Sequence, residues 1–175
     1  MSKSYKEIMN DITTFIFDVD GVLTDGSVFV TNEGEMLRTM NIRDGYAMKA
    51  AVESGYKLCI ISGGSNEGVR VRLRNLGITD IYLGTPNKVE TFNEYAGLYQ
   101  IKPENVLYMG DDIPDYHVMK LVGLATCPQD ASPEIKTISG YISHKHGGKG
   151  AVRDVIEQVM KTQGKWNTHF EGNHD

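Results

Sequence analysis

Two aspartates, Asp18 and Asp20, follow directly on a short apolar run near the start of the chain. The run, residues 13–19, is rich in Thr, Phe, Ile and Val and is hydrophobic on both faces, which is typical of a strand buried in a parallel sheet. Because the carboxylates are two residues apart where this strand ends, we expect them to project roughly the same way. Such a pair is costly unless a cation or a shared proton compensates. The sequence therefore favours a charged site here over the solvated turn that D-x-D usually forms.

Ser62 and Lys88 follow two later apolar runs and could bind an anion. Ser62 ends the run at 56–62 and is followed by two glycines and a predicted helix. Its hydroxyl and the free N–H groups of that helix can face one phosphoryl group. Lys88 lies in the first turn of the helix after the run at 78–83 and could neutralise the phosphate and nearby acids. Taken alone, Ser62 could equally be an ordinary strand-end hydroxyl and Lys88 a solvated helix residue.

The acidic segment GDDIPD, residues 110–115, follows the run at 105–109. It could be a plain acidic turn. If the fourth strand lies beside the first, however, Asp111 can complete a site for a hard cation. Carboxylate, carbonyl and water oxygens without a thiolate favour Mg²⁺, which is therefore the cofactor we expect.

The elements that must position these residues alternate along the chain after residue 44. We expect strands at 13–19, 56–62, 78–83, 105–109, 123–127 and 141–143, and helices at 45–54, 65–76, 87–99, 113–122, 132–138 and 150–163. Ser65 and Asn87 are the expected N-caps of the second and third helices. The short joints predict an α/β fold, with a doubly wound, mostly parallel, Rossmann-like sheet. Ligands of such sheets gather at the carboxyl ends of the strands, where Asp18, Ser62 and Asp111 all fall.

Outside this alternation we expect a β-hairpin and two polar ends. Residues 28–40 carry apolar residues on both sides of a turn, which predicts a hairpin after strand one. Residues 2–11 form a polar lead-in of up to one helical turn, and residues 164–175 a polar tail. No insertion is long enough for a cap domain, so we expect one domain over 1–175 with its core at about 12–163.

Composition and charge narrow the class of protein. The 175 residues are 40% hydrophobic, enough for one proper core. A net charge of −5 argues against non-specific nucleic-acid binding, so local features must attract an anionic substrate. Cys59 and Cys127 lie in apolar runs and are expected to be buried, reduced thiols. Since no segment is typical of a leader or a membrane span, we expect a cytoplasmic protein with no membrane partner.

The segment DVDGVLTDG, residues 18–26, resembles the first motif of the haloacid dehalogenase superfamily of aspartate-nucleophile phosphatases. Ser62, Lys88 and GDDIPD match the three remaining motifs of that family in chain order. The resemblance implies that Asp18 attacks phosphorus, and that Asp20 protonates the leaving group and later deprotonates water. Because superfamily members with other chemistries lack an acid at the second position, Asp20 favours a phosphate ester as substrate.

The same resemblance implies a set of metal ligands. The Asp18 carboxylate, the Asp20 backbone carbonyl and Asp111 would hold Mg²⁺. Asp112 and Asp115 would be either auxiliary ligands of the metal or outer partners of the metal and of Lys88. Ser62 and Lys88 would hold the charge on the transferred phosphoryl oxygens.

A closer resemblance covers residues 13–165 and rests on NIRDG at 41–45 and GGKGAVRD at 147–154. These segments are similar to the small, capless subfamily that contains 3-deoxy-manno-octulosonate 8-phosphate (KDO 8-phosphate) phosphatase. The resemblance implies a phosphorylated keto-deoxy sugar acid of lipopolysaccharide biosynthesis as substrate, and a homotetramer joined through the hairpin. It implies the following contacts to the sugar acid: Asn41, Ile42, Arg43, Asp44, Gly45, Lys49, Gly63 and Arg72. If these residues have no role in binding, residues 41–45 would simply start a helix, and Lys49 and Arg72 would be solvated charges on helices.

One position departs from that subfamily. Its members commonly carry Arg or a similar long side chain where this chain has Gly64. The loss predicts weaker recognition of the substrate carboxylate, or transfer of that role to Arg43 or Arg72. A nonulosonate 9-phosphate is therefore an alternative substrate, and a non-catalytic module that binds phosphorylated ligands is an alternative of another class. The tail, with Trp166 and Phe170, would either reach a neighbouring active site or be disordered.

Overall fold

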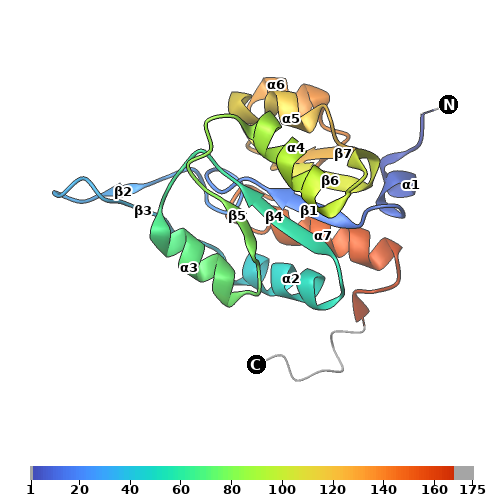
Figure 1. The fold of residues 1–175 in the computed structure, drawn as a ribbon, viewed down its shortest axis with the longest axis horizontal. Helices are drawn as coiled ribbons and strands as arrows, with labels where there is room; N and C mark the ends of the chain where they lie inside the picture. Colours follow the sequence, from blue (N-terminus) through green and yellow to red (C-terminus); the bar gives the residue numbers. More distant parts are fainter. Residues whose placement is uncertain (1, 168–175) are drawn as a thin grey trace.

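A six-stranded parallel sheet forms the centre of the molecule (Figure 1). The computed structural model describes residues 2–167. The strands, in spatial order, are β5 (Asp80–Tyr82), β4 (Lys57–Ile61), β1 (Thr14–Phe17), β6 (Val106–Met109), β7 (Leu124–Cys127) and β8 (Tyr141–Ile142). All five neighbouring pairs are parallel. The predicted doubly wound α/β fold is confirmed, and no cap domain is present among the described residues.

The register places the ends of three strands side by side. Phe17, the last residue of β1, pairs with Ile60 of β4 and with Met109 of β6. The segments that begin at Asp18, Ser62 and Gly110 therefore leave the sheet at one edge. This is the edge where ligands of such sheets bind.

Helices cover both faces of the sheet (Figure 1). The longer ones are α2 (Ile42–Glu53), α3 (Glu67–Asn75), α4 (Lys88–Tyr99) and α7 (Ala151–Thr162), and the shorter ones are α1 (Tyr5–Met9), α5 (Tyr116–Met119), α6 (Pro133–Ile138) and the 3₁₀ helices η1 (Pro103–Asn105) and η2 (Ile113–Asp115). Side chains of α1, α2, α3 and α7 share one core cluster with Phe15 and Phe17, whereas α4, α5 and α6 share another with Ile16. This alternation along β1 follows from the period of two in a strand.

Three helices differ from those expected. The helix expected at 45–54 begins at Ile42, because Asn41 caps it. The N-cap of α3 is Asn66 and not Ser65, because the Asn66 side chain accepts the N–H of Val69 at 3.0 Å. The helix expected at 113–122 is only η2 followed by α5, and Asp115, at the end of η2, is fully buried. Asn87 caps α4 as predicted, accepting the N–H groups of two residues in its first turn.

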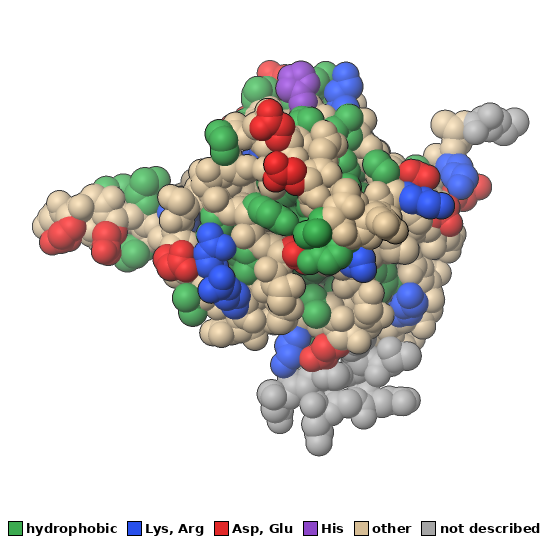
Figure 2. Space-filling model, in the orientation of Figure 1, with side chains coloured by type: hydrophobic (Ala, Val, Ile, Leu, Met, Phe, Trp, Pro, Cys, Tyr) green, Lys and Arg blue, Asp and Glu red, His purple; other side chains and the backbone are tan. Residues whose placement is uncertain are grey.

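The predicted hairpin is confirmed and projects from the body of the protein (Figure 1). It consists of β2 (Phe29–Val30) and β3 (Met36–Leu37) in antiparallel pairing. The four apolar side chains of these strands are 45–71% exposed. Figure 2 shows hydrophobic side chains interspersed with acidic ones along this projection. The apolar residues of the hairpin are therefore not explained by packing within this chain.

The C-terminal segment and the cysteines can also be compared with the sequence-based expectations. Trp166 is buried against the protein's own core, so the expectation that it reaches a neighbouring site is wrong. Phe170 lies outside the described residues. Cys59 and Cys127 are buried and free, as predicted. Within residues 2–167, every helix is too short or too polar to cross a membrane.

Candidate functional site

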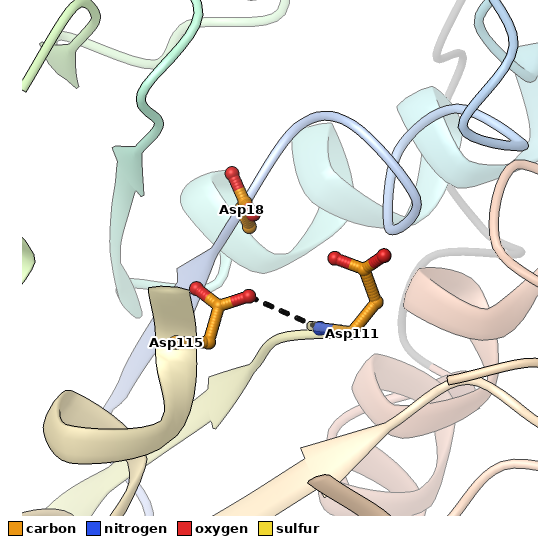
Figure 3. Close-up of side chains that lie close together, drawn as sticks. All are labelled: Asp18, Asp111 and Asp115. Atoms are coloured by element: carbon orange, nitrogen blue, oxygen red, sulfur yellow. Dashed lines mark hydrogen bonds between the residues drawn. The ribbon is translucent and has the colours of Figure 1, made fainter. Parts of the chain in front are cut away.

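A cluster of three acidic side chains lies where β1 and β6 end. Figure 3 shows Asp18 just beyond β1, Asp111 just beyond β6, and Asp115 on the short helix that follows. One carboxylate oxygen from each lies within 4.8 Å of the others. Asp18 and Asp115 are buried and Asp111 is half-buried. The strand order thus brings Asp111 beside Asp18, as the sequence predicted.

Lys88 enters this cluster from the first position of α4. Its Nζ lies 2.8 Å from Asp18 Oδ2 and 2.7 Å from Asp115 Oδ1. The Asn87 cap fixes the start of the helix at this point, so the lysine projects from a capped first turn. A buried ammonium between two carboxylates offsets part of their desolvation.

Asp115 supports the cluster through hydrogen bonds to its neighbours. Its Oδ1 accepts the hydroxyl of Tyr108 at 2.9 Å. Its Oδ2 accepts the N–H of Asp111 at 3.1 Å, the bond that is dashed in Figure 3. With Lys88 also on Oδ1, both of its oxygens are engaged. Asp112, by contrast, is exposed and accepts the N–H of Ile113, which starts η2.

The electrostatics of the cluster favour a bound cation. Burial, followed by repulsion from Asp115, raises the pKa of Asp18 to about 7, although Lys88 opposes the shift. Burial, followed by repulsion from Asp18, raises the pKa of Asp111 to about 8. The two carboxylates raise the pKa of Lys88 despite its desolvation, so it remains charged. Two carboxyl groups are therefore held back from ionising, and a divalent cation would favour their ionised forms.

The donor set fits Mg²⁺. The candidate cluster consists of carboxylate oxygens, with no sulfur or imidazole ligand, and hard oxygen ligands are those that Mg²⁺ takes. Gly21 has φ +80, and a Cβ at this position would overlap the Asp111 carboxylate. A glycine is thus required for Asp111 to approach the turn after β1.

Asp20 lies outside the cluster and pairs with a residue that the sequence analysis missed. Arg38, just after β3, donates from Nε to Asp20 Oδ1 at 3.0 Å and from Nη2 to Oδ2 at 3.1 Å. The two motif aspartates therefore have different cationic partners, Lys88 for Asp18 and Arg38 for Asp20. Only the path of the hairpin brings Arg38 here, and no local pattern in the sequence signals it.

Ser62 and its glycines lie beside this second pair. The buried Ser62 hydroxyl accepts the N–H of Gly64 at 3.2 Å. A small cavity is lined by Asp20, Arg38, Ser62 and Gly64, among others. The guanidinium near position 64 is that of Arg38: a Cβ there would lie 3.3 Å from Arg38 Nη2 and 3.3 Å from Asp20 Oδ2. Ser62 therefore lies beside Asp20 and Arg38, at the same small cavity.

Several residues expected to contact a sugar acid support the helix packing. Asn41 caps α2, accepting the N–H of Arg43 at 2.8 Å, and donates to the carbonyl of Gly148 at 3.2 Å. Asp44 is buried, and its Oδ1 accepts the N–H of Arg153 at 2.9 Å, which ties α2 to α7. Burial raises the pKa of Asp44.

The remaining predicted contacts come from two helices. Arg72 of α3 lies against Gly45 of α2, where a Cβ would be 2.5 Å from Arg72 Nη2. Lys49 is half-buried on α2, and Ile42 is exposed at its start. Gly45 therefore provides the space that the Arg72 guanidinium occupies.

A separate basic cavity of about 690 Å³ adjoins the start of α2. Its lining includes Asn41, Arg43, Lys149 and Arg153, and it includes none of Asp18, Ser62, Lys88 or Asp111. Arg43 is therefore placed in a basic environment apart from the acidic cluster.

Comparisons with known proteins give a consistent result. The profile of the haloacid dehalogenase-like hydrolase family matches residues 77–156. A 3-deoxy-D-manno-octulosonate 8-phosphate phosphatase of Salmonella typhi is 41% identical over 155 residues, 89% of this chain and 82% of the relative.

Solved structures agree over nearly the whole chain. The 3-deoxy-D-manno-octulosonate 8-phosphate phosphatase of Yersinia pestis has a TM-score of 0.90 at 36% identity, covering 93% of this chain and 88% of its own. That of Moraxella catarrhalis, in complex with magnesium ion, phosphate ion and KDO, has a TM-score of 0.91 at 31% identity, covering 94% and 95%.

Proposed function

We infer the function from the family: this chain belongs to the haloacid dehalogenase-like hydrolases, and among them to the 3-deoxy-D-manno-octulosonate 8-phosphate phosphatases. We propose that it hydrolyses a phosphorylated keto-deoxy sugar acid. The enzyme class, a phosphatase, follows from the family. The substrate, the reaction path and the role of each residue are the parts that we infer.

Asp18 is the proposed nucleophile. Its Oδ1 accepts the N–H of Val19 at 2.7 Å and its Oδ2 faces Lys88, so the carboxylate is held in one orientation. An ionised, oriented carboxylate can attack phosphorus and form an aspartyl-phosphate while the sugar oxygen departs. Water then hydrolyses the acyl phosphate and regenerates Asp18.

The charge on the phosphoryl group is met by several residues. Lys88 and Ser62 would interact with its oxygens, as preorganised donors do for developing charge. Asp18, Asp111 and the backbone carbonyl of Asp20 would hold Mg²⁺, which when bound supplies Lewis-acid stabilisation of the phosphoryl oxygens. Asp115 would keep Lys88 and Asp111 in place, and Asp112 would fix the start of η2.

Asp20 is the proposed general acid and base. Its side chain is 39% exposed, so it can meet a substrate oxygen that approaches from solvent. It would donate a proton to the departing alkoxide and then accept one from the attacking water, as microscopic reversibility allows.

KDO 8-phosphate is the substrate that we favour. The names of the relatives and the Moraxella catarrhalis complex with KDO support it. We propose Ile42, Arg43, Lys49, Gly63 and Arg72 as contacts of the sugar acid. Asn41, Asp44 and Gly45 would act by fixing the junction of α2 with its neighbours. A nonulosonate 9-phosphate remains the alternative, since Gly64 departs from the subfamily pattern.

One observation carries the reaction: Lys88 links Asp18 to Asp115 in a buried cluster that also contains Asp111. The test measures phosphate release from KDO 8-phosphate, from a nonulosonate 9-phosphate and from a phosphopeptide, with and without EDTA. We expect Mg²⁺-dependent release from a sugar-acid phosphate and none from the Asp18→Asn variant. Turnover by that variant would contradict the mechanism, and preference for the phosphopeptide would contradict the substrate.

We also propose that residues 1–175 form one domain that assembles into a homotetramer through the β2–β3 hairpin. The exposed apolar side chains Phe29, Val30, Met36 and Leu37 support such a contact. Light scattering of the wild type and of a Phe29→Ser, Leu37→Ser variant would test it. A wild type that is monomeric at micromolar concentration would contradict it.

A further inference from the structure

Arg38 and Asp20 form a bidentate ion pair beside the proposed active site. The guanidinium uses Nε and Nη2 to hold both carboxylate oxygens, at 3.0 and 3.1 Å. The Arg38 side chain is only 8% exposed although it belongs to a projecting hairpin. Such a fork fixes the plane of a carboxylate as well as its position, which a point charge such as an ammonium cannot do.

Arg38 is itself held in place by the backbone of β3. Its Nη1 donates to the carbonyl of Met36 at 2.7 Å. The same carbonyl accepts the side-chain amide of Asn66 at 3.1 Å, and Asn66 caps α3. Three nitrogens of the guanidinium therefore have defined partners, and the start of α3 anchors the base of the hairpin.

Gly64 lies directly against this pair. A side chain there would begin 3.3 Å from Arg38 Nη2 and 3.3 Å from Asp20 Oδ2. Contacts at this distance require the neighbours to move by a few tenths of an ångström. The lack of a side chain at 64 therefore leaves Arg38 and Asp20 in their observed geometry without such a shift.

Asp20 needs an external support of this kind. It lies in the turn after β1, and among residues 2–167 Arg38 supplies the side-chain hydrogen bonds that its carboxylate receives. Lys88 contacts Asp18 and Asp115 instead. A group that transfers a proton must be held within a small range of angles and distances to be effective.

We propose that Arg38 is a positioning residue that orients the carboxyl group of Asp20 for proton transfer, and that it thereby links the base of the hairpin to the chemistry. The proposal rests on the proposed function, because it assigns Arg38 a role through the general acid. Among the described residues, the hydrogen bonds of the Arg38 guanidinium go to Asp20 and to the Met36 carbonyl, and not to Asp18, Lys88 or Asp111. Phosphoryl transfer to Asp18 should therefore survive the loss of Arg38 whenever the leaving group needs no proton.

The dependence of kcat/KM on the leaving group therefore tests the proposal, because a merely structural role of Arg38 would not change that dependence. A sugar alkoxide departs poorly without a proton, whereas nitrophenolate departs readily. We expect Arg38→Met to lower kcat/KM for the sugar phosphate on the order of 100-fold, within the usual contribution of general acid catalysis. For p-nitrophenyl phosphate the same variant should change kcat/KM less than about threefold. The parameter kcat/KM is chosen because it reports the steps up to departure of the leaving group.

The experiment compares five proteins with both substrates: wild type, Arg38→Met, Arg38→Lys, Asp20→Asn and the double variant Arg38→Met, Asp20→Asn. Arg38→Lys should recover only part of the loss, since an ammonium lacks the fork. The double variant should be no worse than Asp20→Asn alone. Arg74→Met, on the exposed side of α3, is the matched control and should resemble the wild type.

The outcomes separate this inference from the proposed function. Suppose that Asp20→Asn shows the expected dependence on the leaving group. The positioning role would then be overturned if Arg38→Met lost kcat/KM equally with both substrates, or if the double variant lost more kcat/KM than Asp20→Asn alone. Should Asp20→Asn show no such dependence, or the wild type release no phosphate, the proposed function itself would fail. If Arg38→Met does not fold, the Arg38→Lys variant tests the positioning role by itself. A value of kcat/KM for the sugar phosphate equal to that of the wild type in Arg38→Lys would show that the two-nitrogen contact of the guanidinium is not needed.

Discussion

Lys88 Nζ lies 2.8 Å from Asp18 Oδ2, and this ion pair joins the start of α4 to the end of β1 inside the protein. Both side chains are almost fully buried. A second carboxylate, Asp115, lies 2.7 Å from the same nitrogen. The lysine therefore neutralises two buried acids that are far apart in the sequence, which makes it important for stability in addition to the phosphate-binding role that we propose for it.

Replacement of Lys88 by Met should reduce both properties. Removing one partner of a buried ion pair costs about 3–5 kcal/mol, because the remaining charges are uncompensated. The cost should be smaller at acidic pH, where Asp18, whose pKa is about 7, becomes neutral. We expect a lower urea midpoint that partly recovers near pH 5, together with a loss of kcat on the order of 100-fold or more. Lys102→Met, at an exposed lysine, is the control, and equal midpoints in the two variants would contradict the prediction.

Magnesium should stabilise the protein more at alkaline than at acidic pH. Without a cation, burial raises the pKa of Asp18 to about 7 and that of Asp111 to about 8. Unfolded carboxyl groups titrate at about pH 4, so these two groups hold more protons in the folded apoprotein than in the unfolded chain between about pH 4 and 8. Their contribution to the free energy of unfolding therefore falls as pH rises through this window. Mg²⁺ binds the ionised form and offsets that loss.

Thermal unfolding with and without Mg²⁺ at about pH 5.5 and 8 would measure this linkage. The rise in melting temperature caused by Mg²⁺ should be larger at the higher pH. Asp111→Asn should abolish most of the rise. An equal effect of Mg²⁺ at both pH values would show that protons and metal do not compete at this cluster.

The sheet edge could be predicted from the sequence because parallel strands with short joints bring their carboxyl ends together. Asp18, Ser62 and Asp111 each follow an apolar run directly, so their common location depends only on strand order. Lys88 could be placed for a related reason, since Asn87 is a strong cap and fixes where α4 begins. The structure brings these residues together, while their catalytic roles remain predictions.

Residues whose position depends on the path of a loop could not be predicted in this way. Arg38 reaches Asp20 only because the hairpin folds back across the turn after β1. Ser65 and Asn66 are adjacent, and either can cap a helix; the choice depends on which side chain reaches the N–H of Val69. Asp44 reads as a site residue in the motif at 41–45, yet it is buried against α7.

Asp44 should therefore contribute more to stability than to substrate affinity. Its Oδ1 accepts the N–H of Arg153, and replacement by Ala would leave that part-buried donor without this partner, at a cost at the lower end of about 1–3 kcal/mol. We expect Asp44→Ala to lower the urea midpoint with little change in KM. Asp11→Ala, at an exposed acid, should leave the midpoint nearly unchanged. A raised KM with an unaltered midpoint would instead identify Asp44 as a contact of the sugar acid.

Gly21 should be essential for the metal site, because its missing side chain leaves room for Asp111. A Cβ at this position would overlap the Asp111 carboxylate, and φ is +80. Gly34, in the hairpin turn, has φ +84, and a Cβ there would meet no atom within 4 Å, so it provides a matched control. Alanine at either site incurs the left-handed backbone cost of about 1–2 kcal/mol. Only Gly21→Ala also displaces a proposed metal ligand.

Calorimetric titration with Mg²⁺ would separate the two effects. We expect Gly21→Ala to weaken Mg²⁺ binding on the order of 10–100-fold, the range seen when the orientation of a ligand is lost. Gly34→Ala should bind Mg²⁺ with wild-type affinity despite its similar loss of stability. If both variants bound Mg²⁺ as the wild type does, Asp111 would be able to turn aside without cost, and its assignment as a metal ligand would have to be abandoned.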